Sequence, residues 1–486
     1  MQIVKSTSAL LTLSALFACT SLVGSVEPLL VEVKQTPSQD YWRSRPTRTL
    51  SALPGFIPTP SESGRTRWGG WASQKVAEGT GFFRTYQAPN GRWWLLDPDG
   101  HKFIHIGVAT VTRGLQPLAF ENSEKIFPIQ GEWAKFSSKL LSDAFFNGSG
   151  AWSEVDAIRN RPDTLPYTLT LNFAADFGRQ LKITEMTPGR VGYNKDVPPV
   201  LHPDFPDWCD RYAKEKVAPY QGDPMLLGMF SDNELPLRRE LLERSINLGQ
   251  KDSTTAPLYH AAVAWLRAHR GDPLDEIDIG SIQEEERVAF LEYACERYYS
   301  SVAKALRKHA PSHLILGSRI HGRITYQPEV LRASARHVDV VSVNLYHAWS
   351  VDTKRLDMWM RETGKPVIIS EFYAKGQDTG MDNNAGAGWT VKTQRDRGLF
   401  YQNFVLSLIE SGNVVGWHWF KYRDNEPWAA ESDPSNRNVN KGVVTWDYKP
   451  YVDLLTQMSE VNAQVYPLTE YFDRMAPNTR VQPASP

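Results

Sequence analysis

The sequence predicts an α/β fold, a (β/α)8 TIM barrel with a short N-terminal β-hairpin extension. Eight apolar runs alternate with helical or loop segments, which is the pattern of a parallel sheet covered by helices. A glutamate follows the fourth run and another follows the seventh. A charged residue behind a buried strand adds little to packing, so these two favour a barrel with chemistry at one end. The length of 486 residues suits one barrel with long insertions.

The first 25 residues predict an export signal. Lys5 supplies a positive charge, and Ala9 to Val23 form an apolar run that is too short to span a bilayer comfortably. Small residues allow cleavage after Ser25, and Cys19 offers an alternative lipoprotein anchor. We therefore expect an exported protein, either periplasmic, secreted or anchored through Cys19.

The next two segments precede the barrel. Residues 26–66 are rich in Pro, Ser and Thr without periodicity, so we expect an extended linker or strap. Residues 67–100 hold two strand-like stretches around the turn Pro89-Asn90-Gly91, which predicts an antiparallel hairpin. The catalytic barrel is expected over residues 101–471, and residues 472–486 are expected to form a tail.

The barrel strands are expected where apolar character is continuous, as in strands that are buried on both faces. The eight runs are Phe103–Val111, Ala144–Gly148, Tyr167–Asn172, Leu226–Phe230, Leu314–Arg319, Val338–Tyr346, Pro366–Phe372 and Val414–Phe420. Apolar residues at three- and four-residue intervals predict a helix over Glu284–His309. The glycine-rich loop from Ala374 to Val391 follows the second glutamate, and we expect it to close over a substrate.

Composition narrows the classes of function. A net charge of −1 gives no general attraction to nucleic acid, and no segment beyond the export signal is apolar enough to span a membrane. Sixteen tryptophans and nineteen tyrosines supply flat faces that suit sugar rings. The chain has no HExxH, Cys-x-x-Cys, GxGxxG or Walker A pattern, so we expect no metal and no cofactor. Cys209 and Cys295 are expected to be buried free thiols, although one bridge stays open.

Glu234 and Glu371 are the candidate catalytic residues, at the ends of the fourth and seventh runs. Across the top of a barrel they would face each other, which is the arrangement of a retaining glycosidase. In that chemistry one carboxylic acid protonates the leaving oxygen and the other carboxylate attacks the anomeric carbon, from about 5–5.5 Å away. The pair therefore predicts glycoside hydrolysis by two glutamates.

Six further side chains are candidates for substrate binding. The Asn233 amide is suited to a sugar hydroxyl, and the Tyr346 hydroxyl is suited to holding Glu371 ionised. Trp419 is the candidate sugar platform on the last strand. The remaining three are polar groups at the expected mouth, each either a substrate contact or an ion-pair partner, namely Arg113, Arg319 and His321.

These motifs resemble clan A glycoside hydrolases, and most closely the β-agarases of glycoside hydrolase family 50. The resemblance runs from about Trp68 to Tyr471 and is carried by Gly91–Gly100, Phe146-Asn147-Gly148, Asp232-Asn233-Glu234, Ser370–Gly376, His418–Tyr422 and Asn440–Val444. It implies that Glu234 is the acid/base, that Glu371 is the nucleophile, and that the substrate is a β-linked marine galactan such as agarose.

Two alternatives remain open from the sequence. One is a clan A exo-β-glycosidase that acts with the same carboxylates on porphyran, a carrageenan-type galactan or β-galactoside oligomers. The other is a non-catalytic, secreted carbohydrate-binding barrel, which would ordinarily have lost one of the two glutamates. In each case the expected partner is a polysaccharide or oligosaccharide, and the oligomeric state stays unknown.

Overall fold

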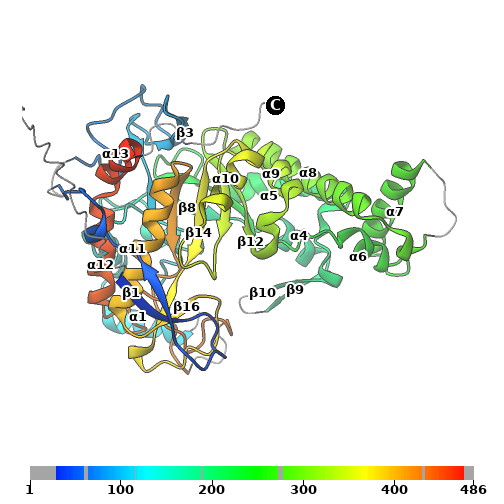
Figure 1. Cartoon of the computed structure of the whole chain (residues 1–486). Helices are drawn as coiled ribbons and strands as arrows, with labels where there is room; N and C mark the ends of the chain where they lie inside the picture. The colour runs from blue at the N-terminus through cyan, green and yellow to red at the C-terminus, as the bar shows by residue number, and fades with distance from the viewer. Residues whose placement is uncertain are drawn as a thin grey trace, which may run out of the picture.

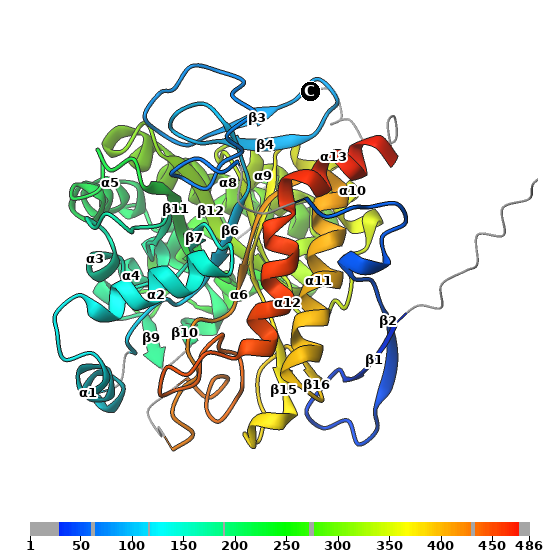
Figure 2. The same cartoon turned by 90° about the vertical axis from the view of Figure 1, so that its left-hand side faces the viewer.

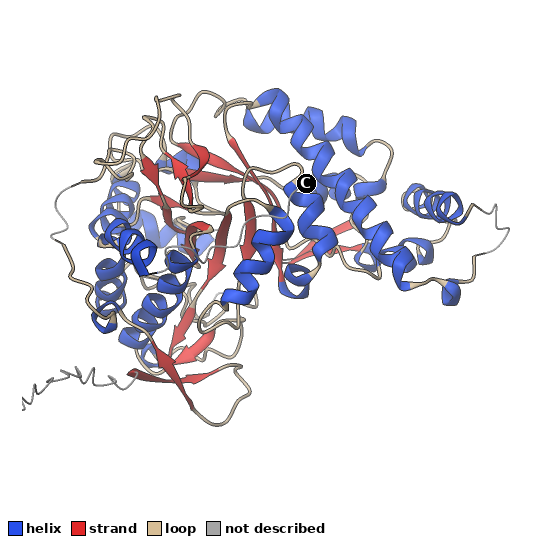
Figure 3. Ribbon diagram, turned by 45° about the horizontal axis from the view of Figure 1, so that its top comes forward, coloured by secondary structure: helices blue, strands red, loops and turns tan. Residues whose placement is uncertain are grey.

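The predicted TIM barrel is confirmed by the computed structural model, which describes residues 29–59, 64–114, 117–187, 190–271, 277–428 and 433–475. Eight parallel strands close into a barrel, with helices around the outside (Figure 3). In chain order the strands are β6 (His105–Val108), β7 (Gly148–Ser149), β8 (Tyr167–Thr170), β11 (Leu226–Asn233), β12 (Leu314–His321), β13 (Val341–Asn344), β14 (Val367–Phe372) and β17 (Val414–Trp419). Each strand falls within or largely over one of the eight predicted runs.

The helices connect successive strands and cover the barrel (Figure 1). They are α1 (Pro117–Ile126), α2 (Glu132–Asp143), α3 (Val155–Ile158), α4 (Phe173–Gln180), α5 (Phe205–Val217), α6 (Leu241–Asn247), α7 (Ala256–Arg270), α8 (Glu284–His309), α9 (Pro328–Ala335), α10 (Thr353–Thr363), α11 (Gln394–Ser411), α12 (Val452–Ala463) and α13 (Val465–Met475). The predicted helix over Glu284–His309 is confirmed as α8. The insertion after β11 forms an arm of α6 and α7 that projects away from the barrel, on the right in Figure 1.

The N-terminal hairpin covers one end of the barrel. It consists of β3 (Arg84–Gln87) and β4 (Trp93–Leu96), joined by β5 (Lys102–Phe103). Four hairpin-region residues pack against the first residues of the barrel strands, namely Trp68, Phe83, Leu95 and Phe103. Burial of this apolar surface holds the hairpin on the barrel. The carboxyl-terminal ends of the barrel strands lie at the opposite end of the barrel, which is called the mouth below.

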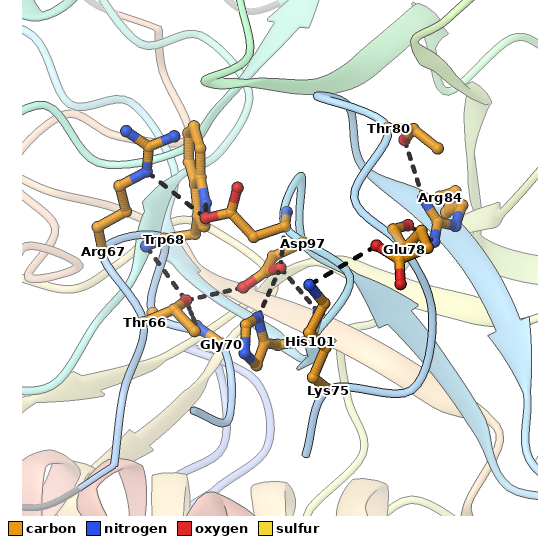
Figure 4. A network of polar contacts seen from close by, with 12 residues as sticks. Thr66, Arg67, Trp68, Gly70, Lys75, Glu78, Thr80, Arg84, Asp97 and His101 are labelled. Carbon is orange, nitrogen blue, oxygen red and sulfur yellow. Dashed lines mark hydrogen bonds and ion pairs between the residues drawn. The ribbon is translucent and has the colours of Figure 1, made fainter. Parts of the chain in front are cut away.

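A buried carboxylate fixes the turn that follows the hairpin (Figure 4). Asp97 is fully buried, and it accepts hydrogen bonds from the Thr66 hydroxyl at 2.7 Å and from the His101 amide at 2.9 Å. Gly100 has φ +93°, and a Cβ there would lie 2.0 Å from the carbonyl oxygen of Ala77. The turn therefore requires glycine, and it ties residues 64–77 to the hairpin.

The expected linker over residues 26–66 contains two strands that the sequence did not indicate. β1 (Leu29–Lys34) and β2 (Arg43–Thr47) form a mixed four-stranded sheet with β15 (Ala374–Gly376) and β16 (Trp389–Val391), at the end of the barrel opposite β3 and β4 (Figure 2). Val31 and Val33 are buried in this sheet. Strands this short gain their stability from the surface that they cover, so the Pro-rich composition hid them.

The glycine-rich loop after β14 is pinned to the barrel by several hydrogen bonds. The Lys375 ammonium donates to the carbonyl oxygens of Asn383, Ala385 and Gly386, at 3.4, 3.0 and 3.3 Å. Asn383 in turn accepts from the amide of Asn440 at 2.8 Å. These bonds hold the loop in one conformation, and closure over a substrate stays a prediction.

Three other expectations concern the termini and the cysteines. The export signal, including Cys19, and most of the tail over residues 472–486 lie outside the described residues. Within the described part of the chain, no helix is both long and apolar enough to cross a membrane. Cys209 and Cys295 are buried free thiols, which confirms the favoured prediction.

Candidate active site

The backbone at the mouth is unusual just beyond four barrel strands. Thr110, Trp152, Glu234 and His347 follow β6, β7, β11 and β13, and all four have φ between +51° and +63°. Residues with a Cβ rarely adopt this left-handed conformation, and such strain concentrates at functional sites. The mouth of the barrel is therefore the candidate functional site.

Glu371 lies on β14 and is buried, with 5% of its surface exposed. The Arg319 guanidinium, from β12, forms an ion pair with one carboxylate oxygen at 2.5 Å. The Tyr346 hydroxyl donates to the other oxygen. Both partners stabilise the negative charge and fix the direction of the carboxylate, which are the requirements of a nucleophile.

Arg319 is itself held in place by aromatic rings. Its guanidinium lies 4.9 Å from the ring centre of Trp152 and 5.6 Å from that of Phe230. Two of its nitrogens, Nε and Nη2, are buried without a hydrogen-bond partner among the described residues. A buried donor without a partner is costly, so these two nitrogens retain donor capacity beyond the ion pair with Glu371.

Glu234 comes one residue after β11 and is half-buried at the mouth. Its amide donates to the carbonyl oxygen of Arg319 at 3.0 Å, which continues the β11–β12 pairing past the strand end. One carboxylate oxygen lies 3.3 Å from Nδ1 of His321, and the other accepts from the Asn344 amide at 2.9 Å. The partners of both glutamates thus come from β12, β13 and the residues that follow them, and Arg319 contacts both, Glu371 through its side chain and Glu234 through its backbone.

Asn344 connects the segments that carry Glu234 and Glu371. Its amide nitrogen donates to Asn233 at 3.1 Å as well as to Glu234. Its amide oxygen accepts from the Ser370 hydroxyl at 2.7 Å, and Ser370 precedes Glu371 on β14. One side chain on β13 therefore sets the relative positions of the fourth and seventh strands at the mouth.

The charges around the site shift three pKa values. Burial raises the pKa of Glu234, but the hydrogen bonds from His321 and Asn344 and the charge of Arg319 bring it below its usual value overall. Burial lowers the pKa of His321, and Glu234 raises it overall. Burial and the charge of Glu371 raise the pKa of Tyr346 well above its usual value, so this hydroxyl remains a donor. The two shifts of Glu234 and His321 therefore both favour the charged forms of this pair.

Arg113 lies apart from this network. It forms an ion pair with Glu154 and lies 4.3 Å from the ring centre of Phe120. The same pair lines a cavity of about 830 Å³ between α1, α2 and α3, whose lining contains neither Glu234 nor Glu371. Of the two roles considered for Arg113, the structure gives it the ion pair.

The prediction of Trp419 as the sugar platform is wrong, because this side chain has no exposed surface. Its indole nitrogen donates to the carbonyl oxygen of Lys441 at 2.9 Å, and its ring packs against Phe372. Alternation along β17 turns Trp417 and Trp419 outward to the helices. The partly exposed aromatic ring at the end of this strand is Phe420, which lies 6.0 Å from the ring of Tyr373.

The site contains residues that the motifs did not single out. Asn344 and Tyr346 lie two positions apart, which is the spacing of side chains on one face of a strand, and this spacing was the available signal. Trp152 and Phe420 contribute rings, and their roles depend on contacts between strands that are distant in sequence. Among the described residues, no group of three or more His, Cys, Asp or Glu is arranged to hold a metal ion.

Comparison with known proteins gives two relatives in sequence. β-Agarase B of Vibrio sp. (strain JT0107) is 25% identical over 492 aligned residues, which cover 84% of this chain and 51% of that protein. β-Agarase A of the same organism is 28% identical over 371 residues, which cover 69% of this chain and 36% of that protein. The chain thus spans about half the length of the first relative and less of the second. No family model matches the chain.

The fold has a nearer counterpart among solved structures. The crystal structure of BpGH50 superimposes with a TM-score of 0.80 and 29% sequence identity, over 92% of this chain and 96% of that one. In sequence and in fold the chain is therefore similar to the β-agarases and to a family 50 structure, and the resemblance drawn from its motifs is confirmed.

Proposed function

We propose that this relative of the β-agarases is a retaining glycoside hydrolase, which cleaves β-1,4-galactosidic bonds in agarose or a related marine galactan. The observation that carries the proposal is the pair Glu234 and Glu371 at one barrel mouth, linked through Asn344 and Ser370. The names of the relatives support the substrate class. The proposal assigns a role in the reaction to Glu371, to Glu234 and to the side chains around them.

Glu371 is the nucleophile of the first step. Its carboxylate attacks the anomeric carbon while the bond from that carbon to the leaving oxygen breaks. The ion pair with Arg319 and the hydrogen bond from Tyr346 keep it ionised and aimed. The leaving oxygen takes the proton of Glu234, and a covalent glycosyl-enzyme results.

Glu234 acts as acid and then as base. In the free enzyme its proton resides on His321, 3.3 Å away, and a substrate that excludes water favours transfer of that proton to the carboxylate. In the second step the Glu234 carboxylate removes a proton from water, the water oxygen attacks the anomeric carbon, and Glu371 departs. The Glu234–His321 pair thus supplies and recovers one proton in each cycle.

The sugar beside the nucleophile is bound by rings and amides in this proposal. Phe420 takes the role first assigned to Trp419, since its ring is partly exposed at the end of β17. Trp152, also partly exposed, supports Arg319 from the other side. Asn233 points its amide toward the same mouth, next to Asn344.

The test is a product assay of the wild type and of E371Q, E234Q and E215Q on agarose and neoagaro-oligosaccharides. Glu215 is an exposed glutamate paired only with Lys216, so E215Q controls for the loss of a carboxylate. We expect E371Q to release no sugar and E234Q to lose about two to four orders of magnitude in rate, with E215Q unchanged. Unchanged turnover in E371Q would rule out the two-glutamate mechanism.

Export is part of the same proposal, because a polymeric galactan is too large to be cut inside the cell. The signal expected over residues 1–25, with Cys19 as the alternative anchor, is tested by N-terminal sequencing of the mature protein. A mature N-terminus near residue 26 indicates a free protein, and one at Cys19 indicates a lipid anchor.

A further inference from the structure

Three lysines are buried beside the active site, Lys375 on β15 and Lys421 and Lys441 in the segment after β17. The exposed fractions of Lys375, Lys421 and Lys441 are 0%, 6% and 2%. Lysine is almost never buried to this degree unless its charge is paired. Each of the three buried ammonium groups therefore needs partners that compensate its charge.

Lys375 is explained by its neighbours, since its ammonium donates to three carbonyl oxygens of the loop after β14. The other two ammonium groups are far less well satisfied. Lys421 donates to the amide oxygen of Asn425 at 2.5 Å, and Lys441 donates to that of Asn436 at 2.6 Å. Each ammonium carries three N–H groups, so both have donors to spare.

The carboxylates nearby are engaged elsewhere. Asp424 accepts from the backbone amides of Lys441 and Gly442, at 2.7 and 2.6 Å. Glu426 forms an ion pair with Arg423. Asp433 accepts from the Asn436 amide at 2.8 Å, and so orients Asn436 toward Lys441. Among the described residues, neither Lys421 nor Lys441 has a carboxylate within ion-pair distance.

The two lysines lie next to the reacting centre. The Lys441 ammonium is 4.6 Å from the ring centre of Tyr373 and 5.3 Å from that of Phe420. The Tyr373 ring lies 5.4 Å from that of Tyr346, which donates to Glu371. The backbone amide of Lys421 donates to the carbonyl oxygen of Lys441 at 3.1 Å, so the two residues lie side by side. Glu371, with 5% of its surface exposed, is buried to a similar degree as the two lysines. The burial of the lysines is therefore compatible with contact to a substrate that reaches Glu371.

We propose that Lys421 and Lys441 form an anion subsite, which binds the sulfate ester or the carboxylate of a substituted galactan beside the bond that is cleaved. Two ammonium groups with free N–H donors, flanked by the amides Asn425 and Asn436, match an oxyanion. A bound anion would also supply the charge partner that the buried lysines lack. The inference rests on the proposed function, because the subsite adjoins the same glutamates.

The lowered pKa values of the two lysines agree with this assignment, and they provide a second quantity to measure, the uptake of protons on binding. Burial, with the charge of Lys421, lowers the pKa of Lys441 to about 7, and burial lowers that of Lys421 to about 8. At pH 8 the empty site is therefore only partly protonated. A bound anion favours the charged ammonium, so binding takes up protons from the buffer.

The first experiment measures binding to E371Q, which keeps the full chain and blocks turnover. Galactose 6-sulfate, galacturonate, inorganic sulfate and neutral galactose are titrated by calorimetry at pH 8, in buffers of different ionisation enthalpy and at equal ionic strength. We expect the anionic probes to bind at least about tenfold more tightly than galactose, with proton uptake. The two sugar probes distinguish a sulfate ester from a carboxylate.

The second experiment removes the charges one at a time. K421Q and K441Q, each combined with E371Q, are expected to lose about tenfold to hundredfold in affinity for the preferred anion relative to galactose, along with the proton uptake. K421R keeps the charge and should keep the preference. K449Q removes an exposed lysine that pairs with Asp447, and it should leave preference and proton uptake as in E371Q alone.

Two outcomes would overturn the subsite. One is equal binding of galactose and of every anionic probe to E371Q, and the other is an unchanged anion preference in both K421Q and K441Q. Hydrolysis of neutral neoagaro-oligosaccharides by the wild type is measured separately. If the wild type hydrolyses the oligosaccharides but E371Q shows no preference for anions, the anion subsite is wrong and the proposed function stands. If E371Q binds anions but the wild type hydrolyses no galactan, the proposed function is wrong and the anion subsite stands.

Discussion

Glu234 and His321 lie 3.3 Å apart, and the proposed mechanism has these two side chains share one proton. The pKa of His321 is raised and that of Glu234 is lowered, so the pair loses its shared proton at the raised pKa of the histidine. The high-pH limb of kcat/KM therefore reports His321 in the wild type. In H321Q the proton must come from Glu234 alone.

We accordingly predict that H321Q moves the high-pH limb of kcat/KM to lower pH and narrows the pH profile. The measurement is kcat/KM from pH 4 to 9 on a neoagaro-oligosaccharide, with H337Q as the control, because His337 pairs with Glu296 away from the mouth. A high-pH limb that stays in place in H321Q would exclude proton sharing by this pair.

Arg319 gives a second prediction at this scale. Its guanidinium binds Glu371, stacks near Trp152 and keeps two further nitrogens buried. Lysine preserves the charge but has neither the planar stacking surface nor the fixed fork of donors. R319K should therefore lower kcat about tenfold to hundredfold with a smaller change in KM. A kcat equal to that of the wild type would mean that charge alone suffices at this position.

The polar side chains were the part of the candidate site that could best be predicted from the sequence. Glu234, Glu371, Tyr346 and His321 were identifiable because polar groups at the ends of apolar runs have no packing role. Trp419 was misassigned because both faces of a barrel strand are buried, so alternation alone cannot tell inward from outward. Lys421 and Lys441 gave no signal, since their burial depends on the segment that folds back over β17.

At the scale of elements, the join between α7 and α8 makes a measurable contribution to stability. Glu286 closes the capping box of α8 by accepting from the Gln283 amide at 2.8 Å, and it also pairs with Arg270 at 2.6 Å. The hydrogen bond from Arg270, opposed by burial, holds the pKa of Glu286 at about 2. This carboxylate therefore stabilises both the helix start and the arm.

We predict that E286Q lowers the free energy of unfolding by about 1 to 3 kcal/mol at pH 7. Glutamine retains the capping contact, so the loss measures the charge. Because the folded-state pKa is depressed, the contribution is fully present above the unfolded value of about 4.5 and is lost as pH falls through about 2. Urea unfolding at several pH values checks this, with the exposed neighbour in E285Q as control. A difference between E286Q and wild type that persists at pH 2 would contradict it.

Elements were predictable where one periodicity continued for long enough. α8 and the strands β11, β12, β14 and β17 were visible because their apolar patterns are uninterrupted. β1 and β2 were missed because both are short, and because β1, to which β2 pairs, joins the sheet through β16, which lies more than 300 residues away in the chain. Such pairing is a property of the folded barrel and leaves no local pattern.

At the scale of the whole molecule, the strap formed by β1 and β2 connects the N-terminal segment to the active site. Val33 pairs with Val391 on β16, and β16 pairs with β15, which follows the Glu371 strand. Thr47 and Pro46 accept from the indole nitrogen of Trp349 at 3.2 Å. The loop that carries Lys375 is thus held from the barrel side and from the strap side.

We predict that V33D destabilises the molecule and lowers activity together. Val33 is buried, so aspartate there places an unpaired charge inside the four-stranded sheet, at a cost of about 2 to 4 kcal/mol. Glu32 on the same strand faces outward and pairs with Lys392, so E32Q is the matched control. The measurements are thermal unfolding, kcat on a neoagaro-oligosaccharide, and amide exchange at Thr390 and Val391.

The three measurements separate two ways in which the strap can be joined to the barrel. If the strap belongs to the cooperative unit, V33D unfolds in one transition at lower temperature, and kcat falls because β15 and β16 no longer hold the loop beside Glu371. If the strap only rests on the sheet, amide exchange at Thr390 and Val391 rises while the unfolding temperature and kcat stay at the E32Q values. We expect the first result, since Val31 and Val33 are both buried and Arg48 anchors the same segment to Glu410 on α11.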